Sequence, residues 1–161
     1  MQKALTQMNL QLHTVITDLT GTTGLNIVRS ILAGVHDPEQ LAVHRDPRCK
    51  ADKAELVAAL TGNYRAEHLF SLRQNFAAYE FHLGQIAECD VAVEALLRNL
   101  AAQQPSPSAA VPPPRRKPTA NNHAPHFDIR TPLHRLTGGA DLSQIDAIGP
   151  QAALQLVADR H

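Results

Sequence analysis

The sequence contains no tryptophan, and aromatic residues make up only 4% of its 161 residues. The core is therefore expected to consist of leucine, alanine, valine and isoleucine, which favours a helical fold. An excess of charge is also missing, because 15 basic side chains balance 15 acidic ones. Global charge thus gives no reason to expect nucleic-acid binding, although a local basic cluster can still contact phosphate.

Cysteines and long apolar runs are equally scarce. Cys49 and Cys89 are the only cysteines, and they lie in no metal-binding or redox spacing, as is usual for free thiols of an intracellular protein. No apolar run is long enough to cross a bilayer, and the N-terminus lacks the charged and then apolar plan of a signal peptide. The sequence predicts a soluble, cytoplasmic protein without a membrane partner.

Motifs of the common catalytic and metal sites are absent as well. The sequence has no nucleophile elbow GxSxG, no phosphate loop GxxxxGK[ST], no dinucleotide loop before a strand pattern and no zinc motif HExxH. His123 and His126 lie close together, but no third or fourth metal ligand accompanies them. We therefore predict no catalytic residue, no metal site and no cofactor in this chain.

The strongest pattern present is a heptad repeat over residues 65–103, which we call the seam. Its apolar residues alternate at spacings of three and four, as in a helix whose apolar stripe another helix covers. Such a helix would be roughly 55 Å long at ~1.5 Å per residue, so part of it is expected to pack outside the local fold. Asp90 interrupts the seam and either sets the register of a coiled coil or faces solvent where the coil opens. The predicted coiled-coil interface comprises Leu69, Leu72, Phe76, Tyr79, Leu83, Ile86, Asp90, Val93, Leu97 and Leu100.

A compact helical unit is expected ahead of the seam, at residues 1–62. Residues 2–19 repeat the three-four spacing and predict a first helix, although no capping residue precedes it. Further short helices are expected to begin near Asp37-Pro38 and to span residues 51–60.

The turn between Gly21 and Gly24 is a candidate site for contact with phosphate. Gly21 and Gly24 flank Thr22 and Thr23, one of which is expected to cap a helix that ends at Gly34. The turn is either a plain connection between packed helices or a tight hairpin whose backbone amides bind a phosphate. A nucleotide-clamping loop of the KH type would need flanking strands, which the sequence does not show.

Composition changes after Gln103. Residues 104–132 are rich in proline and have no apolar periodicity, and proline is incompatible with both helix interiors and strand ladders. We predict a linker there. Its basic triplet, Arg115, Arg116 and Lys117, is either solvated or in contact with phosphate.

Residues 133–161 predict the start of a further domain. Ile145 to Gly149 form a turn of the type apolar-small-apolar-Gly, and helical spacing follows, which outlines an incomplete helix-hairpin-helix. Ala147 stands where such turns usually have their first glycine. Backbone amides at a hairpin of this kind can bind a phosphate without reading sequence. The predicted nucleic-acid contacts are Gly21, Gly24, Arg115, Arg116, Lys117, Arg130, Arg135 and Gly149.

Several stretches resemble a known family in their order along the chain. They are RDPRCK at residues 45–50, GNYR-x-EHLF-x-L at 62–72, QIAECD at 85–90 and HFDIRTPLHRLTGG at 126–139. These motifs are similar to the middle of the IS-one-ten-type insertion-sequence transposases, which are bridge-RNA-guided DNA recombinases. The resemblance spans nearly all of the chain.

The resemblance implies a division of roles. Members of this family carry an N-terminal RuvC-like domain with magnesium-binding acidic residues, a helical coiled coil that assembles protomers, and a C-terminal domain with a serine nucleophile. Only the coiled coil and the opening of the C-terminal domain match here, so the resemblance transfers no catalytic residue, and magnesium is expected only in the acidic domain. It implies DNA, a guide RNA, and further copies or a full-length transposase as partners. An uncapped first helix and an unfinished last hairpin are what truncation at both ends would leave.

The sequence therefore predicts an all-α chain and three rival functions. The chain is expected to be a transposase fragment that is inactive by itself, a regulator that pairs with full-length transposase, or a simple helix-hairpin-helix DNA binder. The predicted parts are a helical unit at 1–62, a long coiled-coil helix at 63–103, a proline-rich basic linker at 104–132 and an incomplete hairpin at 133–161.

Overall fold

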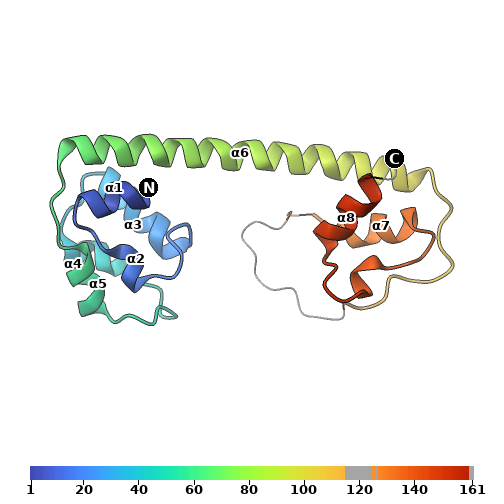
Figure 1. The fold of residues 1–161 in the computed structure, drawn as a ribbon, viewed down its shortest axis with the longest axis horizontal. Coiled ribbons are helices and arrows are strands. Elements are labelled where there is room, and N and C mark those ends of the chain that lie inside the picture. Colours follow the sequence, from blue (N-terminus) through green and yellow to red (C-terminus); the bar gives the residue numbers. More distant parts are fainter. Residues whose placement is uncertain (115–124, 126, 160–161) are drawn as a thin grey trace. The chain divides into compact units, whose positions relative to one another are not determined.

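The computed structural model describes residues 1–114, 125 and 127–159. Every regular element in these ranges is a helix, so the predicted all-α class is confirmed (Figure 1). The α-helices are α1 Gln2–Gln7, α2 Leu12–Val15, α3 Thr22–Leu32, α4 Pro38–Leu41, α5 Lys53–Leu60, α6 Ala66–Ala102, α7 Arg130–Leu136 and α8 Pro150–Ala158, and two 3-10 helices are η1 Ala42–His44 and η2 Leu142–Gln144.

The chain divides into two compact units, Met1–His82 and Leu83–His161, and the division falls inside α6. The predicted boundaries at residues 62 and 103 stay predictions. The first turns of α6 bury side chains among the N-terminal helices, and its last turns bury side chains among the C-terminal ones.

The N-terminal unit is built around leucine, isoleucine and methionine side chains from α1 to α6. The single helix expected over residues 2–19 is two helices, because Asn9 adopts a left-handed conformation with a φ of 60° and ends the first of them. The turn lets the carbonyl of Met8 accept a hydrogen bond of 2.8 Å from the amide of Asn63. Gly62 lies beside it, where a Cβ atom would approach that carbonyl to 2.3 Å.

Local signals fix most of the helix ends in this unit. Asp37 accepts a hydrogen bond from the amide of Glu39 ahead of α4, and Asp52 forms a reciprocal capping box with Glu55 at the start of α5. Gly34 follows α3 with a φ of 95°, which confirms the predicted end of that helix. At its start the predicted threonine cap is wrong, since the capping residue is Gly21 and no side chain caps the helix.

The start of α6 is attached to α3 by a cation as well as by apolar packing. The guanidinium carbon of Arg29 lies 5.5 Å from the centre of the Phe76 ring, and its Nη2 lies 3.5 Å from Oε1 of Glu80. Tyr64, just before α6, stacks on His36 and donates to the carbonyl of Leu60, and its burial raises the pKa of the phenol to about 12.

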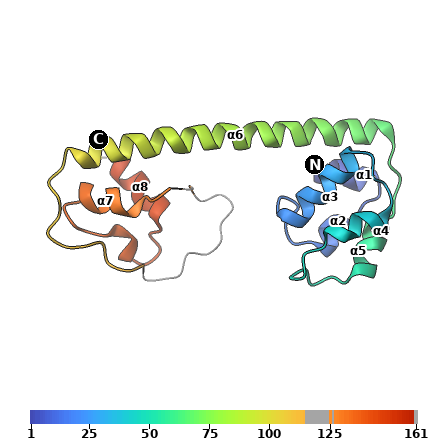
Figure 2. The same cartoon turned by 180° about the vertical axis from the view of Figure 1, so that it is seen from behind.

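The C-terminal unit has a smaller core. Its buried members are Leu97 of α6, Ile129 just ahead of α7, Leu133 of α7 and Ala153 of α8. Figure 2 shows α7 and α8 from behind, together with the unbroken course of α6. Within the described part of the chain, no helix combines the length and the apolar character needed to span a bilayer.

Replacing Leu72 by Ala should lower the free energy of unfolding of the N-terminal unit by about 3 kcal/mol, because this fully buried side chain would leave a cavity. Urea denaturation followed by circular dichroism measures the loss. Val43, which is 74% exposed, supplies the matched control, and Val43→Ala should change stability by less than about 0.5 kcal/mol. Equal effects of the two substitutions would show that Leu72 is not a core residue.

Candidate functional site

The chain's own helices cover both ends of the predicted seam. Leu72 and Phe76 are buried in the core of the N-terminal unit, and Leu69 packs against it. At the other end, Leu97 is buried in the core of the C-terminal unit, and Val93 packs against that core. These members of the predicted coiled-coil interface therefore pack on apolar surface of the same chain, and contact of the remaining members with another chain stays a prediction.

The middle of the seam is open to solvent. Leu83 is 41% exposed and Ile86 is 55% exposed, whereas Tyr79, Asp90 and Leu100 are half-buried. Asp90 was predicted either to set the register of a coiled coil or to face solvent where the coil opens, and both roles stay predictions.

A second apolar stripe, which the sequence reading missed, runs along the other side of α6. Phe70, Phe81 and Val91 are 64%, 63% and 68% exposed. They share one heptad frame with three small residues, and at about 100° per residue this frame lies across the helix from Leu83 and Ile86. The spacing was visible in the sequence, but Gln74 and Glu88 interrupt it. We call this surface the outer stripe, and its members are Phe70, Ala77, Phe81, Gly84, Val91 and Ala95.

Gly84 lies at the centre of the outer stripe. A Cβ atom built there meets no other atom within 4 Å, so no contact within the described chain requires a glycine. Glycine in a helix interior costs about 1 kcal/mol relative to alanine. Packing inside this chain does not explain Gly84.

The predicted contacts Gly21 and Gly24 lie at the start of α3. Gly24 has a packing role, because a Cβ atom there would approach the carbonyl oxygen of Leu19 to 2.2 Å. Gly21 borders an open depression with Arg48 and Lys50. The hydroxyl of Thr23 already accepts a hydrogen bond of 3.2 Å from the amide of Asp46. The predicted phosphate contact here remains a prediction.

Arg48 is paired within this depression. Its Nε lies 3.0 Å from Oδ1 of Asp46, and this hydrogen bond lowers the pKa of the half-buried carboxyl group to about 2. An anion that bound there would have to compete with Asp46 for the guanidinium group of Arg48.

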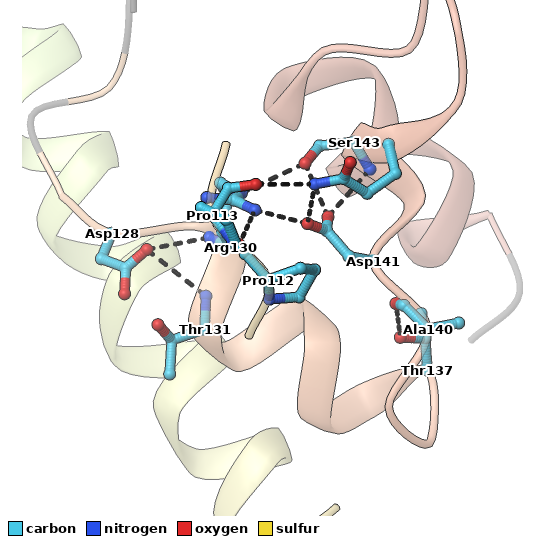
Figure 3. A network of polar contacts seen from close by, with 10 residues as sticks. Pro112, Pro113, Asp128, Arg130, Thr131, Thr137, Ala140, Asp141 and Ser143 are labelled. Atoms are coloured by element: carbon cyan, nitrogen blue, oxygen red, sulfur yellow. Dashed lines mark hydrogen bonds and ion pairs between the residues drawn. The ribbon is translucent and has the colours of Figure 1, made fainter. Parts of the chain in front are cut away.

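Arg130, predicted to contact nucleic acid, is the centre of an internal polar network (Figure 3). It pairs with Asp141, and the two side chains are only 20% and 6% exposed. Its Nε donates to Oγ of Ser143 at 3.1 Å and its Nη2 to the carbonyl of Pro112 at 2.8 Å. Gln144 donates to the carbonyl of Pro113 at 3.0 Å. These contacts attach the end of the described linker to the C-terminal unit.

The network controls the ionisation of Asp141. Burial alone would raise the pKa of this carboxyl group, but hydrogen bonds from Ser143, Arg130 and Gln144 hold it well below its usual range. Asp141 is therefore the charged anchor that keeps Arg130 buried.

The other predicted basic contacts fall into two groups. Arg135 of α7 donates from Nε and Nη2 to the carbonyl of Gln104, at 2.8 and 2.6 Å. This contact attaches the start of the linker to α7. Arg115, Arg116 and Lys117 lie outside the described residues, as do His123 and His126.

The predicted hairpin turn has an unusual backbone. Ala147 adopts a φ of 68°, which favours glycine, so the missing glycine leaves a left-handed alanine. Gly149 caps α8 and has open space around its Cα, but Pro150 follows and contributes no amide donor. The element before the turn is only the 3-10 helix η2. The hairpin is thus present in outline, with a short first arm.

Two further observations concern the chemistry and the relatives of the chain. Among the described residues, no group of three His, Cys, Asp or Glu side chains could hold a metal ion.

Comparison with protein-family models, with curated proteins and with solved structures found no match.

Replacing Asp141 by Asn should destabilise the C-terminal unit by about 3 kcal/mol, because Arg130 would keep a buried charge without its partner. Hydrogen exchange of the α7 and α8 amides measures the loss. Since the folded pKa of Asp141 is depressed, its stabilisation is present above about pH 4 and is lost as pH falls further. The variant should lack that acid dependence, and an unchanged acid profile would contradict the role given to Asp141.

Replacing Ala147 by Gly should stabilise the same unit by roughly 0.5–1 kcal/mol, because relief of the left-handed strain exceeds the added entropy of the unfolded chain. Thermal unfolding provides the measurement. Ala152→Gly within α8 is the control and should be destabilising by about 1 kcal/mol. If both substitutions destabilise equally, Ala147 is not strained.

Proposed function

We propose that this chain is an assembly region of a DNA recombinase of the insertion-sequence transposase type, in which α6 joins it to other protein chains. The transposase part of the proposal rests on the four motifs that resemble that family. The assembly part rests on one observation: the 37-residue helix α6 exposes several large apolar side chains at once. Those above 40% exposure are Phe70, Phe81, Leu83, Ile86, Val91 and Leu96.

Such exposure favours association because apolar surface is costly to leave in water. Burial of a large apolar side chain contributes about 1.5–3 kcal/mol. Contiguous exposed apolar surface on a soluble domain is typical of protein interaction sites. A partner helix lying along α6 is the arrangement that covers side chains spaced at three and four residues.

The proposal assigns contact with nucleic acid to fewer residues than the sequence analysis did. Arg130 and Arg135 serve the fold of the C-terminal unit through their internal hydrogen bonds. The basic triplet at residues 115–117 is the phosphate contact that we propose for this chain, with DNA or guide RNA as its partner. We assign no catalytic residue.

The exposed helix also favours an alternative within the same proposal. A chain that carries this surface can pair with a full-length transposase that has the same helix, and so act as a regulator. The two roles differ in partner, and co-purification with a full-length family member distinguishes them.

The direct test changes the exposed surface of α6. A variant carrying Phe81→Lys, Leu83→Lys, Ile86→Lys and Val91→Lys should lose self-association by at least about a hundredfold, since four apolar contacts disappear. Sedimentation velocity over a wide range of protein concentration measures the association. Lysine favours helix, so α6 should persist in the circular dichroism spectrum.

The control is Val43→Lys, which changes an exposed apolar residue of η1 and should leave association intact. A wild-type chain that is monomeric at every concentration, alone and with full-length transposase, would overturn the proposal. Association that survives all four lysines would overturn it too.

A further inference from the structure

The first part of the linker is bound to the C-terminal unit through its main chain. We call residues 104–114 the strap. Arg130 donates from Nη2 to the carbonyl of Pro112 at 2.8 Å (Figure 3). Gln144 donates from Nε2 to the carbonyl of Pro113 at 3.0 Å. The carbonyl of Gln104, at the other end of the strap, accepts both hydrogen bonds of Arg135.

The middle of the strap approaches the turn that follows α7. Gly139 in this turn has a φ of 98°, and a Cβ atom on it would lie 3.3 Å from the Cβ atom of Pro107. A glycine therefore lets the strap pass close to the turn. We call the residues that receive the strap the strap site, and they are Arg130, Arg135, Gly139 and Gln144.

The unit itself holds the donors of the strap site in place. Arg130 pairs with Asp141 and donates from Nε to Oγ of Ser143 at 3.1 Å. Gln144 donates to Oδ2 of Asp141 at 3.2 Å. These contacts do not involve the strap, so the donors keep their positions when the strap leaves. Donors that are fixed in advance lower the cost of binding a ligand.

The strap itself contributes little apolar burial. None of residues 104–114 is buried, and only Pro107, Val111 and Pro112 are half-buried. Hydrophobic stabilisation grows with the apolar area removed from water, so the strap is held mainly by hydrogen bonds to its carbonyl groups. The net contribution of such bonds is modest, because water replaces them when the strap leaves. A competing segment can therefore displace the strap.

We propose that the strap site binds an extended proline-rich segment of another protein, and that the strap is its displaceable ligand within the chain. Proline fixes φ and keeps a segment extended, with carbonyl groups that are free to accept hydrogen bonds. The donors of the site bind main-chain carbonyls, which every such segment presents. This inference concerns the C-terminal unit and does not depend on the proposed role of α6.

A different protein is favoured over a second copy of this chain. The strap of a second copy would make the same contacts as the chain's own strap, but it would lack the high effective concentration that attachment to the same chain gives. Exchange between copies thus gains nothing. A foreign segment can add contacts, because the middle of the strap carries only the small side chains of Ser106, Ser108, Ala109 and Ala110.

Loosening the strap tests whether it can be displaced. The full chain with Pro112→Gly and Pro113→Gly keeps both carbonyl groups, but ordering its strap costs more conformational entropy. A fluorescein-labelled peptide with the sequence of residues 104–114 should bind this loosened variant about tenfold more tightly than the wild-type chain, because the attached competitor is weaker. Fluorescence anisotropy measures both dissociation constants.

Gln144 tests where the peptide binds. Gln144→Ala in the loosened variant should weaken peptide binding at least about fivefold, since one donor to a carbonyl is lost. Gln155→Ala is the matched control, because Gln155 is an exposed glutamine of α8 in the same unit, and binding should stay within about twofold. Circular dichroism restricts the comparison to folded variants.

Each outcome has one meaning. Tighter binding by the loosened variant, together with its loss in Gln144→Ala alone, supports the strap site. Equal affinity of the loosened and wild-type chains, no binding by either, or an equal loss in Gln155→Ala overturns the inference. A dimer that weakens in the loosened variant in sedimentation equilibrium would show exchange between copies and overturn the choice of partner. None of these results bears on α6, whose role fails only if the lysine variant of that helix still associates or the wild-type chain never does.

Discussion

The structure depends on how the apolar surface of α6 is shared between the chain itself and its surroundings. Leu72 and Phe76 complete the core of the N-terminal unit, and Leu97 completes that of the C-terminal unit. Neither core contains a tryptophan, and α6 contributes one buried leucine to each of them, Leu72 to the N-terminal core and Leu97 to the C-terminal core. A helix this long still has more apolar surface than two small cores cover. The remainder, on the middle turns of the seam and on the outer stripe, stays in water in the single chain.

Polar contacts attach the linker to the C-terminal unit, whereas buried apolar side chains attach α6 to each unit. In the Arg130–Asp141 pair the side chains are 20% and 6% exposed, and Arg130 also donates to the carbonyl of Pro112, while Arg135 donates to that of Gln104. Removing Asp141 would leave the charge of Arg130 without its partner, so this arginine is needed for the fold of the unit. The basic side chains that a sequence reader would assign to nucleic acid are thus, in this unit, the ones that keep the chain in place. A phosphate that bound Arg130 or Arg135 would have to compete with these internal hydrogen bonds.

Local patterns in the sequence predicted the class of fold and most helix ends. Gly34, Asp37 and the long three-four repeat each act through neighbouring residues, so their outcomes were readable in advance. Other outcomes depend on residues that are distant in sequence, so no local pattern predicts them. They are the break at Asn9, the burial of Leu72 and Leu97, and the partners of Arg130. The outer stripe was missed for a different reason. Its spacing is present, but small residues and two polar ones conceal a surface that is recognised only from the exposure of side chains in the folded structure.

The central claim is that α6 carries apolar surface meant for another chain. Hydroxyl-radical footprinting of the whole protein tests it most directly, because one spectrum compares two phenylalanines of the same helix. Phe76 is 8% exposed and should be protected at every concentration, whereas Phe81 is 63% exposed and should become protected as concentration rises. Reactivity of Phe81 that stays high and constant up to the highest concentration would contradict the claim.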